Sequence, residues 1–258
     1  MSPKFSPVPI LMYHKVGEPV LTKRDTFLNV SAQNFSKQMY LLKRLGYTAR
    51  TFGEVLEAWT YQKPLPPRTF VITFDDGYVN VGRYAAPILQ ELGFTATVFA
   101  VSQAVGKTND WDEGTNNVVI PLMEWARLHE LQGLGWEIAG HTAHHPHLDV
   151  LSDAEAFEEI VRGKAELEAE LQAQVKTFCY PFGHLNPRTP ELVKRAGFLG
   201  ACTTQRGIAK QADNPFLLSR VKVAYRDNTL AFLYRLVLAP HLPDLRKKRR
   251  SSLSNLQA

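Results

Sequence analysis

The sequence has few cysteines and no long apolar stretch. Cys179 and Cys202 are its two cysteines, too few for a disulfide scaffold, and because each lies in an apolar run we expect two buried free thiols. No stretch approaches the roughly 20 apolar residues that a membrane-spanning helix needs. Residues 1–7 also lack the apolar core of a secretion signal, so we expect a cytoplasmic protein, or an extracytoplasmic one if a leader has been removed.

The chain has little excess charge apart from its C-terminal end. The formal net charge is +5, and residues 246–250 alone contribute five positive charges. The remainder is therefore neutral, so we expect no nucleic-acid partner. We expect residues 241–258 to form a basic, disordered tail, which could at most touch an anionic surface.

The composition is that of an ordinary globular protein, with 45% hydrophobic and 21% charged residues. From Arg68 onward, apolar runs alternate with helical patterns, including a helix over 81–92 that Pro87 is expected to kink. The runs predict strands at 69–74, 95–101, 136–139, 175–180, 200–204 and 217–224. This alternation predicts parallel strands with helical crossovers, in either a β/α barrel or a doubly wound open sheet.

A stiff proline-rich connector, 63–67, separates an N-terminal extension, residues 1–67, from the main domain, residues 68–240. The extension contains a predicted strand over 9–16 that carries His14 near its end. Two helices follow, one capped by Ser31 and one capped by Thr51. We expect the strand to join the sheet of the main domain.

Two adjacent acids, Asp75 and Asp76, directly follow the apolar run 69–74. Adjacent carboxylates at the end of a buried strand repel each other unless they share a proton or bind a cation. A divalent metal also favours neutral imidazoles, so histidines elsewhere in the chain become candidate partners.

Four of the eight histidines, His141, His144, His145 and His147, directly follow the predicted strand 136–139. His141 and His145 are spaced so that one helical turn would point both rings in the same direction. With one of the two aspartates they would form a three-ligand site for zinc or another divalent metal, and the other aspartate would be free to act as a base. His144 and His147 are expected to be supporting or exposed.

Each of these groups, taken alone, has a purely structural interpretation. Asp75 and Asp76 could cap the next helix, the paired histidines could lie in a surface loop, and His14 could be a core histidine. However, all of them follow predicted strands, as does the segment Tyr180-Pro-Phe-Gly183. In a barrel these strand ends share one face, where active sites assemble, whereas an open sheet would bring fewer of them together.

Two segments closely resemble the first two motifs of the polysaccharide deacetylases, carbohydrate esterase family 4 (the NodB homology domain). They are Thr73-Phe-Asp-Asp-Gly77 and His141-Thr-Ala-His-His145, and the resemblance covers about residues 68–238. It implies a distorted (β/α)7 barrel and the removal of N-acetyl groups from amino sugars. It further implies that Asp75 is the general base and that the metal ligands are Asp76, His141 and His145.

The third motif, Phe178-Cys-Tyr-Pro-Phe-Gly183, matches in part, because the family commonly has arginine at Cys179 and tyrosine at Phe182. Arg220 could supply the missing guanidinium. Leu11-Met-Tyr-His14 resembles the N-terminal histidine segment of the permuted branch of the family, which includes the poly-N-acetylglucosamine deacetylases.

The resemblance implies a metal-dependent hydrolase for an acetylated, N-acetylglucosamine-containing poly- or oligosaccharide. Zinc is the expected metal, with cobalt, manganese, nickel or iron as alternatives. His14 would donate a proton, while Tyr180 and Phe182 would contact the substrate and its oxyanion. The alternatives are a deacetylase or deformylase of a small or lipid-linked amino sugar and a catalytically inactive carbohydrate-binding barrel.

Overall fold

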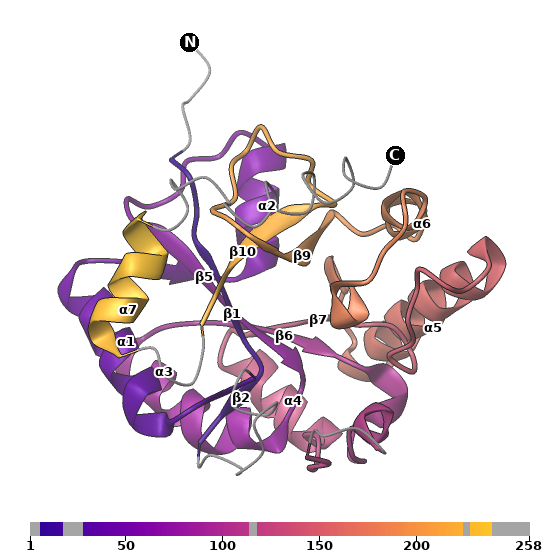
Figure 1. The fold of residues 1–258 in the computed structure, drawn as a ribbon, viewed down its shortest axis with the longest axis horizontal. Helices are drawn as coiled ribbons and strands as arrows, with labels where there is room; N and C mark the ends of the chain where they lie inside the picture. The colour runs from indigo at the N-terminus through magenta and orange to yellow at the C-terminus, as the bar shows by residue number, and fades with distance from the viewer. Residues whose placement is uncertain (1–5, 18–27, 114–117, 224–227, 239–258) are drawn as a thin grey trace, which may run out of the picture.

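Seven strands run parallel and close into a barrel within the residues that the computed structural model describes, 6–17, 28–113, 118–223 and 228–238 (Figure 1). Helices surround the strands. The barrel strands are β1 (Ile10–Tyr13), β5 (Thr69–Asp76), β6 (Thr97–Ala100), β7 (Glu137–Gly140), β8 (Thr177–Cys179), β9 (Gly200–Arg206) and β10 (Leu218–Lys222). The predicted (β/α)7 barrel is thus confirmed, and the open-sheet alternative is wrong.

The N-terminal strand β1 closes the barrel, because it pairs in parallel with β10 on one side and with β5 on the other. The predicted strand that leads to His14 is therefore part of the barrel. A further strand, β4 (Thr48–Arg50), pairs with the first residues of β5 and extends the sheet beyond the ring. β2 (Lys15–Val16) and β3 (Asn29–Val30) form a separate two-stranded parallel sheet.

Seven α-helices lie within the described residues. They are α1 (Ala32–Arg44), α2 (Phe52–Thr60), α3 (Ala86–Leu92), α4 (Trp125–Gly133), α5 (Asp153–Leu171), α6 (Thr189–Arg195) and α7 (Thr229–Leu233), the last continued by a π-helical turn, Tyr234–Leu238. Ser31 and Thr51 cap α1 and α2 as predicted. The predicted helix over 81–92 is interrupted: a π-helical turn, Val81–Ala85, precedes α3. Pro87 explains the irregularity, because it has no N–H to donate to the preceding turn.

Alternate residues of the strands face the inside of the barrel. On β1, Ile10 packs in the inner hydrophobic cluster, while Met12 and then His14 line a pocket above it. On β5, Val71 belongs to the same inner cluster, and Asp75 lines the pocket. Because side chains in a strand alternate between faces, β1 and β5 direct apolar groups inward near their starts and a polar group into the pocket at their C-terminal ends.

Helix α2 covers the opposite end of the barrel. Its apolar residues recur at helical spacing and join the inner cluster of the strands: Phe52, Val55, Leu56 and Trp59. The carboxylate of Glu137 accepts hydrogen bonds from the backbone N–H of Gly53 at 2.8 Å and from the hydroxyls of Thr97 and Thr177 at 2.9 and 2.8 Å. The N-terminus of α2 is thereby anchored to β6, β7 and β8. Because α2 closes this end of the barrel, the pocket lies at the other end, where the strands have their C-termini.

Both cysteines are buried and free, as predicted. Among the described helices, none combines the length and the apolar character needed to cross a membrane. The predicted basic tail, 241–258, lies outside the described residues.

Candidate metal and catalytic site

The two adjacent carboxylates point to different partners. Asp75 continues the inward-facing row of β5, whereas Asp76 has a left-handed backbone with a φ of 72°. Aspartate tolerates this conformation better than most residues, and Gly77 continues the turn with a φ of 81°. The turn separates two groups that would otherwise repel each other: Asp75 contacts a cation inside the barrel, and Asp76 contacts the histidines.

The cation beside Asp75 is Arg220 of β10, which is fully buried. Its Nη1 and Nη2 donate to the two carboxylate oxygens of Asp75 at 2.6 and 2.7 Å. Nε donates to the carbonyl oxygen of Thr203 at 2.9 Å, and Nη1 also donates to the hydroxyl of Thr73 at 3.0 Å. Cys179 lies with its Sγ 3.2 Å from Nη2, so its small side chain leaves room for the guanidinium. Arg220 therefore provides the positive charge that the third motif lacks.

The pairing with Arg220 keeps Asp75 ionised. Burial by itself raises the pKa of the Asp75 carboxyl. The charge of Arg220 and its hydrogen bonds to the carboxylate outweigh burial and hold this pKa below its ordinary value. At neutral pH Asp75 is therefore a carboxylate with fixed orientation, able to accept a hydrogen bond or a proton.

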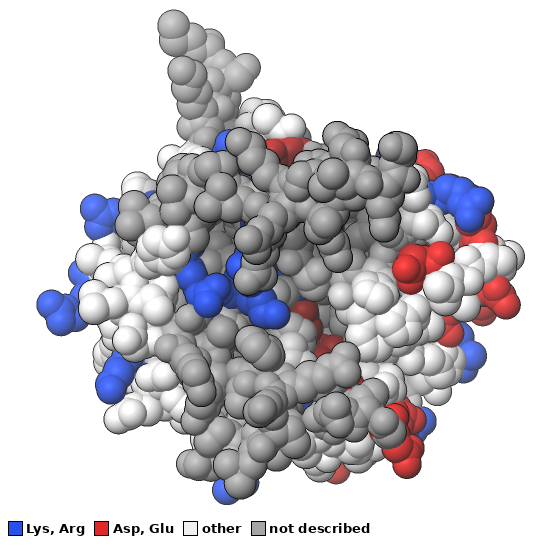
Figure 2. Space-filling model, in the orientation of Figure 1, with Lys and Arg blue, Asp and Glu red and all other residues white. Residues whose placement is uncertain are grey.

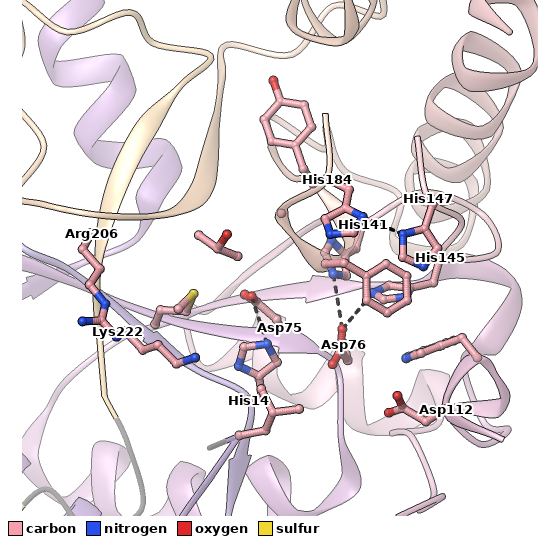
Figure 3. Close-up of a pocket in the computed structure, with 17 residues that line it drawn as sticks. His14, Asp75, Asp76, Asp112, His141, His145, His147, His184, Arg206 and Lys222 are labelled. Atoms are coloured by element: carbon pink, nitrogen blue, oxygen red, sulfur yellow. Dashed lines mark hydrogen bonds and ion pairs between the residues drawn. The ribbon is translucent and has the colours of Figure 1, made fainter. Parts of the chain in front are cut away.

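Asp76, His141 and His145 form the predicted three-residue cluster. Oδ1 of Asp76 lies 3.2 Å from Nε2 of His141 and 3.3 Å from Nε2 of His145 (Figure 3). All three side chains are buried, and their candidate ligand atoms lie within 4.8 Å of one another. Burial raises the pKa of Asp76, but the hydrogen bonds from the two histidines outweigh it and hold the pKa well below its usual range.

The donor set fits a divalent metal. Nδ1 of His141 lies 2.6 Å from the carbonyl oxygen of Cys179, and a carbonyl accepts, so this nitrogen carries the proton. Nε2 points at Asp76, and on losing its proton it would present a lone pair to the cluster, which is the usual arrangement of a metal-binding histidine. His145 has a buried Nδ1 with no hydrogen-bond partner within the described residues, and burial lowers the pKa of this histidine. Burial also lowers the pKa of His141, but Cys179 and Asp76 outweigh it and raise this pKa well above the usual histidine value. A cation held by the two imidazoles and the carboxylate would therefore take the place of a proton on His141.

The histidine segment does not form the helical turn that the spacing suggested. Thr142 and His145 both have left-handed backbones, with φ of 68° and 61°, and the hydroxyl of Thr142 accepts from the backbone N–H of His145 at 2.9 Å. This local hydrogen bond competes successfully with a helix. The two rings nevertheless meet, with centroids 4.8 Å apart, because the turn directs both toward Asp76.

Helix α5 supports the histidine segment from outside the barrel. The backbone N–H of Ala143 donates to the carbonyl oxygen of Glu159 at 3.1 Å. The exposed His144 donates its backbone N–H to the Glu159 carboxylate at 3.0 Å. A side chain at Gly163 would place its Cβ 2.5 Å from the carbonyl carbon of Thr142, so glycine is required for this close contact.

His14 lies beside the proposed base. Its Nε2 is 3.5 Å from Oδ2 of Asp75 (Figure 3). Burial lowers the pKa of His14 below the usual histidine value, and this outweighs the attraction of Asp75 and Asp76. His14 is therefore neutral near pH 7, in a position to exchange a proton with the Asp75 carboxylate.

Tyr180 and Phe182, the predicted contacts of the substrate and its oxyanion, both line the pocket. The Tyr180 hydroxyl donates to the carbonyl oxygen of Phe216 at 2.8 Å, so it is already engaged away from the cluster. Phe182 has a left-handed backbone with a φ of 57° and packs edge-on against His145, with ring centroids 4.4 Å apart. Its other neighbour is the exposed His147, stacked on it at 4.1 Å.

The comparison with protein families agrees with this geometry. Residues 62–201, more than half of the chain, match the family model described as polysaccharide deacetylase. The chain belongs to the polysaccharide deacetylase family. These enzymes hydrolyse N-acetyl amide bonds of sugars and are in general metal-dependent.

Individual relatives and solved structures give the same result. YxkH of Bacillus subtilis, named as a candidate polysaccharide deacetylase, is 27% identical over 217 residues, 84% of this chain and 71% of its own. The poly-beta-1,6-N-acetyl-D-glucosamine N-deacetylase of Staphylococcus aureus is 24% identical over 208 residues, 76% of this chain and 68% of its own. A polysaccharide deacetylase structure from Bacillus cereus superposes with a TM-score of 0.74 at 27% identity, covering 90% of this chain and 69% of that one.

The pocket of this polysaccharide deacetylase has a volume of about 690 Å³ and contains residues that the sequence interpretation missed. They are Trp111, Asp112, His184, Arg206 and Lys222. Trp111 stacks on the His145 ring with centroids 4.3 Å apart. Trp111 and Asp112 lie in a short 3-10 helix, Asp110–Asp112, and His184 follows another, Pro181–Gly183; such short turns carry no periodic signal. The two cations lie at the ends of β9 and β10, and an inspection of strand ends for basic as well as metal-binding residues would have found them.

Proposed function

We propose that this protein is a metal-dependent deacetylase that removes N-acetyl groups from poly- or oligosaccharides containing N-acetylglucosamine. The observation that carries the proposal is the ionised Asp75, held by Arg220 directly beside the Asp76, His141 and His145 cluster. The name of the Staphylococcus aureus relative supports N-acetylglucosamine as the sugar.

Zinc is the metal that we propose, because two imidazoles and one carboxylate suit it, while cobalt, manganese, nickel and iron accept similar donors. When bound by Asp76, His141 and His145, such a metal would polarise the acetyl carbonyl and lower the pKa of a bound water toward about 7.

The protein's own groups would handle the proton. Asp75 accepts the proton of the attacking water as its oxygen bonds to the carbonyl carbon. His14, 3.5 Å from the same carboxylate, then relays a proton to the amine as the carbon–nitrogen bond breaks, releasing acetate and a free amino sugar. A backbone N–H near Phe182 would stabilise the negatively charged oxygen of the intermediate.

The test is acetate release from N-acetylglucosamine oligomers by metal-loaded and chelator-treated protein. We expect turnover that chelation abolishes and metal restores. Asp75→Asn should keep the metal and lose about 100-fold to 10,000-fold in turnover, because it removes the base and spares the ligands. Asp153→Asn makes the same chemical change at an exposed position in the first turn of α5 and should leave turnover unchanged.

Two results would contradict the proposal. Full metal occupancy without acetate release from any oligomer would indicate an inactive sugar-binding barrel. Turnover confined to N-acetylated or N-formylated monosaccharides or lipid-linked sugars would indicate a different substrate class.

A further inference from the structure

Two positively charged side chains line one wall of the pocket. The opposite wall carries His141 and His145, and Asp75 and Asp76 lie between the two walls. Lys222 is the last residue of β10, and Arg206 is the last residue of β9. Figure 3 shows Lys222 directed toward His14, with Arg206 on the outer side of it. In the space-filling view, basic side chains gather beside a hollow in which acidic side chains are visible (Figure 2).

Strand geometry places both cations in the pocket. On β10, Arg220 faces the inside of the barrel and binds Asp75, and Lys222, two residues later, faces the same way at the mouth. On β9, Thr204 and Arg206 likewise line the pocket. Arg220 is the paired neighbour of Arg206 in the sheet, so the two strand ends lie side by side.

Lys222 and Arg206 differ from Arg220 in how their charges are paired. Arg220 is neutralised by both oxygens of Asp75. By contrast, neither Lys222 nor Arg206 has a hydrogen bond or ion pair with an acid in the described ranges 6–17, 28–113, 118–223 and 228–238. Burial, followed by the positive charges of Arg206 and Arg235, lowers the pKa of Lys222. Lys222 is half-buried and Arg206 is exposed at the mouth, so an anion bound between them would offset the repulsion that the buried end of Lys222 experiences.

The charge of Lys222 also acts at the catalytic end of the pocket. Burial is the main reason for the lowered pKa of His14, and the charges of Arg220 and Lys222 act in the same direction. Lys222 is the sheet partner of Met12, two residues before His14, and shares the pocket with Asp75, so a group bound by Lys222 would lie close to the sugar whose acetamide is at Asp75. A neutral N-acetylglucosamine polymer has no group that would pair with these two cations.

We propose that Lys222 and Arg206 bind an anionic group, a phosphate or a carboxylate, on the substrate beside the N-acetylated sugar. This inference rests on the proposed function and adds to it the class of sugar: a negatively charged glycan rather than a neutral homopolymer. Lysine supplies a point charge and arginine a planar pair of donors, and both suit phosphate and carboxylate oxygens.

The experiment measures binding and turnover separately. Calorimetry on the metal-loaded protein compares N-acetylglucosamine oligomers that are neutral, that carry a phosphate ester, or that carry a uronic acid carboxylate. We expect the charged oligomers to bind about 10-fold to 100-fold more tightly than the neutral one, the range of a charge-assisted contact. The phosphate and carboxylate oligomers distinguish the two sources of negative charge.

The variants are Lys222→Met and Arg206→Met, with Lys222→Arg as the conservative replacement and Lys210→Met as the matched control on an exposed segment. The two methionine variants should lose the preference for the charged oligomers, mainly through KM rather than kcat, while metal content stays unchanged. Lys222→Arg should retain most of the preference, and Lys210→Met all of it.

The outcomes separate this inference from the proposed function. Deacetylation without any preference for charged oligomers, or a preference that survives both methionine substitutions, overturns the anion subsite and leaves the deacetylase intact. A preference that depends on Lys222 and Arg206, in a protein that releases no acetate, supports the subsite and overturns the deacetylase.

Discussion

At the scale of single residues, the site depends on how each charged group is paired. Asp75 is buried, and a buried carboxyl without a cation would take up a proton near neutral pH. Arg220 prevents this through two short hydrogen bonds, while Thr203 and Thr73 fix the guanidinium. The protonation state of Asp75, the proposed base, is therefore set by a residue on a different strand.

We expect Arg220→Met to shift the pH dependence of activity. Without the guanidinium, burial of Asp75 is no longer outweighed, and its pKa rises. Because the base works only when ionised, the acidic limb of the kcat/KM profile should move to higher pH. The profile of Arg220→Lys, which keeps the charge but loses the paired geometry, should lie in between. An acidic limb in the same place for Arg220→Met as for the unsubstituted protein would show that Arg220 does not tune the base.

His14→Asn tests whether this histidine belongs to the chemistry. We expect turnover to fall about 100-fold to 10,000-fold, as for loss of a general acid or base, with little change in melting temperature or metal content. Acetate release and thermal unfolding of the same preparation give the answer. A lowered melting temperature with unchanged turnover per folded molecule would make His14 a core histidine.

At the scale of elements, the histidine segment is held between β7 and α5. Its left-handed residues cannot form a helix, so its shape depends on hydrogen bonds to Glu159 and on close packing against the helix. Gly163 makes this approach possible, since any Cβ there would overlap the backbone of Thr142. The proposed metal ligands His141 and His145 are thus positioned by a helix that contributes no ligand itself.

We predict that Gly163→Ala weakens the metal site. The new Cβ would meet backbone atoms, which cannot rotate away, so the segment must move. The expected loss of stability is about 1 to 3 kcal/mol, as for other overpacked positions, together with weaker metal affinity. Thermal unfolding and metal titration measure the two effects. Gly133→Ala on α4 is the control, because no described atom outside its own helical turn lies within 4 Å of the place that a Cβ would take there.

If Gly163→Ala binds metal as tightly as Gly133→Ala does, the packing of α5 has no influence on the ligands, and the histidine segment is positioned by β7 alone.

At the scale of the whole molecule, barrel closure assembles the site from distant parts of the chain. β1 joins β5 and β10, which places His14 and Lys222 next to each other at the mouth near Asp75. Of the proposed ligands, Asp76 is the last residue of β5 and His141 directly follows β7, and β6 lies between these two strands. A metal bound across these strands would connect them, so metal binding should stabilise the folded barrel.

We therefore expect chelation to lower the melting temperature. A ligand present at about 100 times its dissociation constant stabilises the folded state by about 2.7 kcal/mol. His141→Ala should contain less metal than the unsubstituted protein, and chelator should no longer change its melting temperature. Metal analysis together with calorimetric unfolding measures both effects. Equal metal content in the two proteins would remove His141 from the ligand set.

The sequence by itself determined the barrel and the kinds of residue at its mouth. Apolar runs that end in Asp75 and Asp76 or in His141 are local patterns, and strand ends in a β/α barrel share one face. The family resemblance then separated the roles of the two aspartates. The strand ending at His14 was likewise visible from the sequence.

Only the tertiary structure decided how these residues are paired. Arg220 lies 145 positions from Asp75 in the chain, and no local pattern shows that the two meet. The left-handed turn at Thr142 and His145, the cover that α2 forms over the barrel, and the cations Arg206 and Lys222 beside the carboxylates all depend on contacts between distant segments. Such contacts form only when the barrel closes through β1. They join segments that are far apart in the chain, so a local sequence pattern cannot predict them.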